Sequence, residues 1–261
     1  MKIEEVFSKT VLKDKIIIVT GAGRGLGKAM ALALAKAGGD IVLVDRVQEG
    51  IDRTAKEITN IGKKALPINA DVTISKDILE MVEKVQSELG NVDVLVNNAG
   101  LNASHVRHKF EDIPEDEWIN MIKTNVTSVF LVTQMVGRTM LLRGSGKIIN
   151  IASAAGIKAV SETICYGVTK AAIIQMTRAL AVEWAPRGIT VNCIAPGSID
   201  MCPESNNEKH LKMNEERKKK IPLGRLARAE ELGPLLIYLA SNASGYITGE
   251  TIFIDGGLVL G

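Results

Sequence analysis

Short apolar runs alternate along the chain with longer stretches whose apolar positions recur at helical spacing. The short runs predict seven strands, at residues 15–20, 40–44, 65–69, 92–96, 147–151, 189–194 and 251–254. The longer stretches predict helices at residues 25–37, 51–61, 75–89, 114–142, 165–185 and 229–239. Most strands are apolar at nearly every position, which indicates burial on both faces and is typical of a parallel sheet.

This alternation predicts one α/β domain of Rossmann type over residues 1–261, doubly wound, with helices on both faces of a parallel sheet. Pro67 has no N–H to donate, so the third strand should lie at an edge of the sheet. Glycines follow several helical stretches, as Gly62 and Gly90 do, and should end them. Ser75 is placed to cap the helix that it opens.

One segment, at about residues 198–222, interrupts the alternation. It is polar and crowded with charge, including Lys218, Lys219 and Lys220. Long insertions in compact α/β domains are usually functional or disordered. We therefore expect a substrate lid here, with a solvated insertion that has no further role as the alternative.

Composition excludes several classes of protein. The formal net charge is +2 and no basic stripe runs along a helix, which argues against nucleic acid as a partner. Cys165, Cys193 and Cys202 form neither a disulfide framework nor a metal-binding pattern, so we expect a reducing compartment and no metal. The N-terminus lacks an apolar signal core and no run could span a bilayer, so a cytoplasmic protein without a membrane partner is expected.

A glycine-rich turn follows the first strand and opens the first helix, with the sequence Thr20-Gly-Ala-Gly-Arg-Gly-Leu-Gly27. Without side chains in the way, backbone N–H groups and the positive end of a helix dipole can approach a diphosphate. The spacing is Gly21-x-x-x-Gly25-x-Gly27, and Leu26 stands where the commoner dinucleotide motif has glycine. The alternative is a glycine-rich turn without a ligand.

Asp45 ends the second strand, where an acidic side chain can bond the ribose hydroxyls of a dinucleotide. Its carboxylate would repel a 2′-phosphate, so we expect NAD as the cofactor. Arg24 and Arg46 lie close enough in sequence to hold that phosphate instead, which keeps NADP as an alternative; exposure to solvent is the other interpretation of both arginines.

Further motifs follow the remaining strands in order. They are Asp71-Val72, Asn97-Asn-Ala-Gly100, Ser153, Tyr166-Gly-Val-Thr-Lys170 and Pro196-Gly197. Together with the glycine turn they resemble the short-chain dehydrogenase/reductase family over nearly the whole chain, from Lys13 to Gly257. The resemblance implies a single Rossmann-type domain with a seven-stranded parallel sheet.

The resemblance also implies site residues. Asp71 and Val72 match the adenine contacts, and Asn98, Ala99 and Gly100 match the stretch under the adenosine ribose. Pro196, Gly197 and Ile199 match the loop against the nicotinamide carboxamide. The expected cofactor site comprises Gly21, Arg24, Gly25, Leu26, Gly27, Asp45, Arg46, Asp71, Val72, Asn98, Ala99, Gly100, Tyr166, Lys170, Pro196, Gly197 and Ile199. Met201 departs from the family, which often has Thr there, so a side-chain bond to the cofactor is lost.

The same resemblance assigns catalysis to Asn125, Ser153, Tyr166 and Lys170. Tyr166 and Lys170 are four positions apart and share a helix face. A nearby ammonium and an oxidised nicotinamide should favour the phenolate of Tyr166, which would act as acid and base. Ser153 would bond the substrate oxygen, and by resemblance Asn125 holds a water of a proton relay. Singly, Ser153 could be a turn cap, Tyr166 a core aromatic and Lys170 a surface cation.

The segment from Leu101 to His108 follows the fourth strand and lies beside the expected site. Asn102, Ser104, His105 and Arg107 offer donors for hydroxyls or a carboxylate, although His105 and Arg107 could simply be exposed. We therefore expect an NAD-dependent oxidoreductase that interconverts a secondary alcohol and a ketone of a sugar, polyol or sugar acid. In this respect the chain resembles the gluconate and keto-sugar-acid dehydrogenases of the family.

Two alternatives stay open. One is an NADPH-dependent 3-oxoacyl-thioester reductase, whose turn often carries an arginine at the position of Arg24. The other is a non-catalytic NAD-binding sensor or scaffold on the same fold. The long helices 114–142 and 165–185 and the apolar tail Leu258–Leu260 predict a homotetramer.

Overall fold

The computed structural model describes residues 10–201, 204–205 and 207–261 of the chain. Its main sheet has the strand order β3-β2-β1-β4-β5-β6-β9, and every pairing in it is parallel. The strands are β1 (Ile16–Thr20), β2 (Asp40–Asp45), β3 (Ala65–Asn69), β4 (Val94–Asn97), β5 (Gly146–Ile151), β6 (Ile189–Pro196) and β9 (Thr251–Ile254). The prediction of a seven-stranded parallel sheet of Rossmann type is confirmed.

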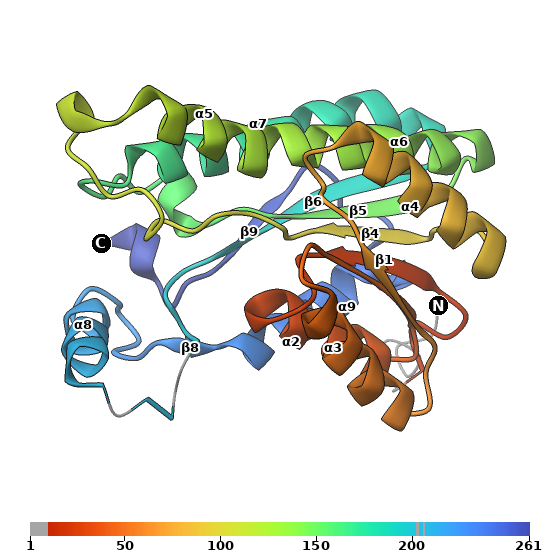
Figure 1. The fold of residues 1–261 in the computed structure, drawn as a ribbon, viewed down its shortest axis with the longest axis horizontal. Helices are drawn as coiled ribbons and strands as arrows, with labels where there is room; N and C mark the ends of the chain where they lie inside the picture. The colour runs from red at the N-terminus through yellow and green to blue at the C-terminus, as the bar shows by residue number, and fades with distance from the viewer. Residues whose placement is uncertain (1–9, 202–203, 206) are drawn as a thin grey trace.

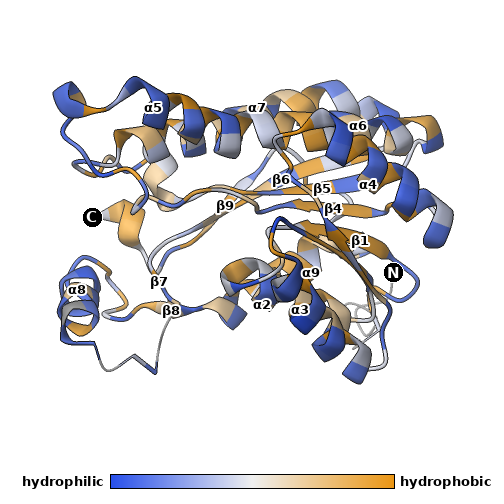
Figure 2. Ribbon diagram, viewed as in Figure 1, coloured by the Kyte–Doolittle hydropathy of each residue, from blue (hydrophilic) through white to orange (hydrophobic). Residues whose placement is uncertain are grey.

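Helices cover both faces of this sheet (Figure 1). One layer holds α2 (Gly25–Lys36), α3 (Gln48–Asn60) and α9 (Gly233–Ala240). The other layer holds α4 (Ser75–Glu88), α5 (Glu115–Ile122), α6 (Ser128–Arg143) and α7 (Ile164–Trp184). Apolar residues gather on the strands and on the helix faces turned toward them, and polar residues lie outside (Figure 2).

The central strands supply side chains to two separate cores. Ile17 and Val19 pack into the core under α2 and α9, whereas Ile18 between them packs into the core under α4 and α6. All three are fully buried. Burial of one such side chain contributes about 1.5–3 kcal/mol, which explains why the strands are apolar at successive positions.

Strand β3 lies at the edge of the sheet, as Pro67 predicted. The Lys64 carbonyl accepts a hydrogen bond from Ile41, and the Ala70 N–H donates to Asp45, so both residues turn their peptide groups toward β2. Alternate residues of a strand point their peptide groups in opposite directions. Pro67 is an odd number of residues from both, so its nitrogen faces the open edge and no ladder bond is lost.

The segment 198–222 contains β7 (Ile199–Asp200), paired with β8 (Ala227–Arg228), and α8 (Glu208–Lys218). Three local predictions need correction. The stretch 114–142 is interrupted by a π-helical turn, η2 (Lys123–Thr127). The stretch 229–239 begins as a 3₁₀ turn. Ser75 is the first residue of α4, and Ile74 stands at the N-cap without a side-chain bond.

The strand order reverses between β1 and β4, which are neighbours in the sheet although two strands separate them in the chain. Ligands of open α/β sheets bind outside the carboxyl ends of the strands at this point. The turn after β1 and the loop after β4 therefore meet where a ligand is expected.

Candidate active site

The glycine turn after β1 leaves a backbone cradle that side chains would fill. Gly21 and Gly25 have φ angles of 67° and 57°, in the left-handed region that favours glycine. A Cβ on Gly27 would stand 2.0 Å from the carbonyl oxygen of Gly21. Helix α2 begins here, and its N-cap residue Arg24 makes no side-chain capping bond with the described residues. The turn therefore fits the diphosphate of a dinucleotide, which would accept from the first N–H groups of α2.

Asn98 and Thr20 join this turn to the end of β4. The Asn98 side-chain amide donates to the carbonyls of Thr20 (2.9 Å) and Gly21 (3.2 Å). The Thr20 hydroxyl accepts from the N–H groups of Asn98 and Ala99, each at 3.0 Å. Sequence reasoning missed Thr20, whose only signal was its place directly before the first glycine. Asn98 and Ala99 thus act in shaping the turn.

Asp45 is fixed at the end of β2 by two backbone groups. Its Oδ2 accepts from Gly23 N at 3.0 Å, and its Oδ1 accepts from Val47 N at 3.1 Å. Both oxygens are therefore held beside the turn, where the ribose of a bound dinucleotide would lie.

The two arginines of the NADP alternative differ in their surroundings. Arg46 pairs with Asp71, with 3.6 Å between Nη1 and Oδ2. Burial alone would raise the pKa of Asp71, but hydrogen bonds from Thr73 and the charge of Arg46 lower it. Arg24 is exposed in the glycine turn. Arg46 thus supports the expected adenine end of the site through Asp71.

Ser153, Tyr166 and Lys170 converge at the carboxyl end of β5. Ser153 follows β5 and caps the 3₁₀ turn η3 (Ala154–Gly156), accepting from Ala155 N at 3.2 Å. Its hydroxyl also bonds Tyr166. Lys170 is only 7% exposed, so it is not a surface cation. Its Nζ lies 5.6 Å from the centre of the Tyr166 ring.

The electrostatics of this group differ from the prediction. Burial raises the pKa of Tyr166, although the hydrogen bond with Ser153 lowers it. We expected the ammonium of Lys170 to make the phenol more acidic, but burial lowers the pKa of Lys170 itself to about 8. The amine donates to the Ile151 carbonyl at 2.8 Å. In the chain alone, Tyr166 is therefore a protonated phenol at neutral pH, ready to donate.

Asn125 lies in the π-helical turn between α5 and α6 and is buried. Its Oδ1 accepts from Leu101 N at 2.7 Å, and its Nδ2 donates to Leu101 O at 2.9 Å. The same Nδ2 donates to the Thr169 hydroxyl at 3.2 Å. Helix π-turns often occur at functional sites. Here the turn allows Asn125 to join the loop after β4 to α7, and its expected role in a water relay stays a prediction.

The loop expected against the nicotinamide follows β6. Gly197 N donates to Ile254 O at 2.9 Å, and a Cβ on Gly197 would stand 2.7 Å from the Asp255 Cα. Pro196 ends β6, and Ile199 begins β7 and packs on the core under α2. The backbone thus runs close to β9 before it reaches the segment 198–222.

The polar loop after β4 is largely satisfied by protein partners. Asn102 Oδ1 accepts from the Ser104 hydroxyl at 2.5 Å and lies 3.0 Å from His105 Nδ1. Arg107 pairs with Glu162 at 3.6 Å, across to the segment before α7. Glu162 has a φ of 63°, which is strained for a residue with a side chain, and sequence reasoning missed it.

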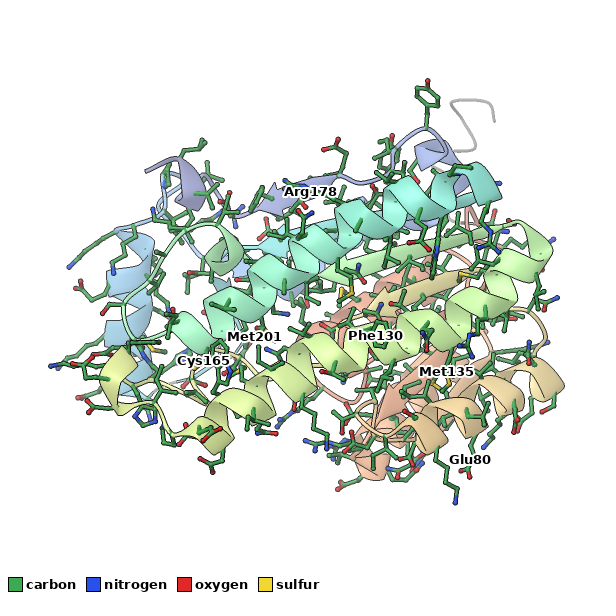
Figure 3. The ribbon with its side chains drawn as sticks, turned by 90° about the horizontal axis from the view of Figure 1, so that it is seen from above. Glu80, Phe130, Met135, Cys165, Arg178 and Met201 are labelled. Atoms are coloured by element: carbon green, nitrogen blue, oxygen red, sulfur yellow. The ribbon has the colours of Figure 1, made fainter. Side chains whose placement is uncertain are left out.

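An apolar cluster holds this loop beside Tyr166. Cys165 is a packed thiol, buried against Val106 and Met121. Figure 3 labels it at the start of α7.

Cys202 lies outside the described residues. Within the described ranges, no three His, Cys, Asp or Glu side chains are grouped to hold a metal ion. No described helix has the length and apolar character needed to cross a membrane.

Comparison with known proteins finds relatives along nearly the whole chain. A family model described as enoyl-(acyl carrier protein) reductase matches residues 21–259. A 3-oxoacyl-[acyl-carrier-protein] reductase of Thermotoga maritima is 39% identical, over 95% of this chain and 99% of the relative. A 2-dehydro-3-deoxy-D-gluconate 5-dehydrogenase of Bacillus subtilis is 38% identical, over 94% and 95%. An NAD-dependent glycerol dehydrogenase of Listeria innocua is 36% identical, over 95% of both chains.

Solved structures of short-chain dehydrogenases superpose on this chain over nearly its whole length. A short-chain type dehydrogenase/reductase of Mycobacterium marinum superposes with a TM-score of 0.89 at 38% identity, over 100% of both chains. A gluconate 5-dehydrogenase of Burkholderia cenocepacia, in complex with NADP and tartrate, superposes with a TM-score of 0.88 at 32% identity, over 97% of this chain and 98% of that one. The fold is thus shared by proteins whose names differ in cofactor and substrate.

Proposed function

Because the chain belongs to the short-chain dehydrogenase/reductase family, we propose that it uses NAD to interconvert a secondary alcohol and a ketone, on a sugar, polyol or sugar acid. The observation that carries the proposal is the convergence of Ser153, Tyr166 and the buried amine of Lys170 at the end of β5, at the same edge of the parallel sheet as the glycine turn.

The residues divide the chemistry between them. When bound, the cofactor supplies or accepts the hydride. Tyr166 gives the proton of its hydroxyl to the ketone oxygen during reduction and takes it from the alcohol during oxidation. Ser153 donates a hydrogen bond to the same substrate oxygen. Lys170 holds a positive charge near the ring when it is protonated, which favours the phenolate that oxidation requires.

Asp45 supports NAD over NADP. Its carboxylate is held by Gly23 N and Val47 N, so it could not easily turn away from a 2′-phosphate. Two negative groups at contact distance repel strongly where water is partly excluded. Arg46, which could otherwise bind that phosphate, pairs with Asp71.

Arg107 supports a substrate with several hydroxyls or a carboxylate. Its guanidinium pairs with Glu162 in the segment just before α7, on which Tyr166 lies. A substrate carboxylate could take the place of Glu162 in a bidentate pair. Relatives that act on glycerol and on a keto-sugar acid fit this class.

A second candidate is an NADPH-dependent 3-oxoacyl-thioester reductase. The exposed Arg24 in the glycine turn favours it, because a free guanidinium there could bind a 2′-phosphate. The Thermotoga maritima relative has the corresponding name.

One set of assays separates the two candidates. Purified protein is given NAD or NADP with a panel of polyols and sugar acids, and NADH or NADPH with the matching keto acids and acetoacetyl thioesters. The proposal expects the highest kcat/KM with NAD(H) and a polyhydroxylated substrate. A preference for NADPH with the thioester would establish the second candidate in its place.

The proposal extends to a cytoplasmic homotetramer with a lid at about residues 198–222. Apolar side chains are exposed on the outer helices, including Ile119 of α5, Phe130 of α6 and Val182 of α7. Phe130 lies on the helical layer seen from above in Figure 3. Such a face is typically covered in an oligomer. Light scattering should give four times the mass of the chain, and a stable monomer would contradict the assembly.

A further inference from the structure

Met201 reaches from the segment after β7 to the glycine turn. Its terminal methyl carbon lies 3.2 Å from the position that a Cβ on Gly25 would occupy, and no other described atom outside the adjoining backbone lies within 4 Å of that position. Gly25 is the first residue of α2. The thioether therefore lies over the N-terminus of the helix at which a diphosphate would bind.

The residue before Met201 ties this segment to α8. Asp200 Oδ1 lies 3.4 Å from His210 Nε2, and the Asn214 side chain approaches the same nitrogen at 3.0 Å. The Asp200 and His210 side chains are each about three-quarters buried. These contacts hold the backbone at Asp200 against α8, next to Met201.

A methionine side chain is poorly suited to contact a bound anion. Its sulfur accepts hydrogen bonds only weakly and its methyl group donates none, so it could not replace the water around a phosphate oxygen. The methyl group and a phosphate oxygen also could not occupy the same space in front of Gly25. We propose that the Met201 side chain covers the diphosphate site of the free protein and that NAD binding must displace it, so that Met201 lowers the affinity for NAD.

This inference rests on the proposed function, because it takes the glycine turn to be an NAD site. It concerns a residue that weakens binding and that touches the turn without taking part in the chemistry. When a group must be displaced by a ligand, the apparent dissociation constant is the intrinsic one divided by the fraction of time that the site is open. Removing the side chain beyond Cβ should therefore tighten binding.

The experiment measures dissociation constants by titration calorimetry for three ligands. NAD and ADP-ribose carry the diphosphate, and adenosine does not. We expect Met201→Ala to lower the Kd for NAD and ADP-ribose by about three- to tenfold and to leave adenosine unchanged. Met201→Leu, which keeps the bulk, should bind all three ligands like the wild type.

Met213→Ala is the matched control. Met213 lies on α8 and is 40% exposed, against 44% for Met201. It should change no Kd. Weaker or unchanged NAD binding by Met201→Ala would overturn the inference, and so would an equal gain for adenosine, which would indicate a general effect. Failure of the wild type and all variants to bind NAD or ADP-ribose would instead contradict the proposed function, and the inference with it.

Discussion

The amine of Lys170 lies 5.6 Å from the centre of the Tyr166 ring, one turn further along α7. Lys170 also donates to the carbonyl of Ile151 at the end of β5, so the amine joins the helix to the sheet. This relationship explains why the lysine is buried. It also places a titratable group, with a pKa lowered to about 8 by burial, beside the phenol that is expected to transfer the proton.

The burial of Lys170 predicts a pH-dependent stability difference. Below about pH 8 the amine is charged in both folded and unfolded chains, so the folded state bears the full cost of burying a charge. Between about pH 8 and 10.5 the folded chain releases its proton before the unfolded chain does, and the wild type gains stability. The stability of Lys170→Met relative to the wild type should therefore fall by about 3 kcal/mol across this range.

Urea unfolding of both proteins at several pH values measures this difference. The contributions of the other titrating groups cancel when one free energy of unfolding is subtracted from the other. If the difference in free energy of unfolding between Lys170→Met and the wild type did not change between pH 7 and 10.5, the burial of an ionisable amine would be contradicted.

Asp45 should decide between the two cofactors. Asp45→Asn removes the charge and keeps an oxygen that can accept from Gly23 N or Val47 N. We expect kcat/KM with NADP to rise about tenfold, which corresponds to about 1.4 kcal/mol. Asp40→Asn changes a carboxylate at the other end of β2, which accepts from Lys64 N, and should leave the ratio of NAD to NADP unchanged. An unchanged ratio in Asp45→Asn would remove Asp45 from cofactor selection.

Gly27→Ala should destroy the cradle. The new methyl group would stand 2.0 Å from the Gly21 carbonyl oxygen, so the turn must open and lose its fit to a diphosphate. Calorimetry should detect no NAD binding. Gly62→Ala is the control, because its φ is 80° and no described atom outside the adjoining backbone lies within 4 Å of the added carbon. That variant should lose about 1–2 kcal/mol of stability through backbone strain and bind NAD normally. Normal NAD binding by Gly27→Ala would show that the cofactor lies elsewhere.

Arg107 should distinguish acidic from neutral substrates. Arg107→Ala removes the guanidinium that a substrate carboxylate would contact, so KM for sugar acids should rise about tenfold or more while KM for neutral polyols changes little. The neighbouring exposed cation Lys109 provides the control variant Lys109→Ala. Equal effects on both substrate types would mean that Arg107 acts only through its pair with Glu162.

Much of the fold could be predicted because burial on both faces leaves a clear pattern. The run Asp40–Asp45 is apolar at every inner position, and Pro67 identified an edge strand by its missing N–H. Helix α8 was not predicted from the sequence, because its residues are almost all polar and its apolar positions show no helical stripe. The π-turn at Asn125 was not predicted either, since such a turn leaves the helical pattern on both sides intact.

The site could be located from the sequence, but its electrostatics could not. Motif spacing brought Tyr166 and Lys170 to one helix face, and the structure agrees. Their pKa values depend on burial by residues far away in the chain, which no local pattern reports. The approach of Met201 to Gly25 joins segments more than 170 residues apart. The resemblance placed residue 201 beside the cofactor, but no local pattern shows that its side chain lies in front of Gly25.

Replacement of the tyrosine hydroxyl tests the central claim most directly. Tyr166→Phe keeps the ring that packs against Val106 and Met121 and removes only the group that would transfer the proton. We expect the Kd for NAD to stay within about twofold and kcat to fall about a thousandfold, with Tyr246→Phe, at a fully exposed tyrosine, unaffected. Turnover by Tyr166→Phe close to that of the wild type would contradict the proposed chemistry.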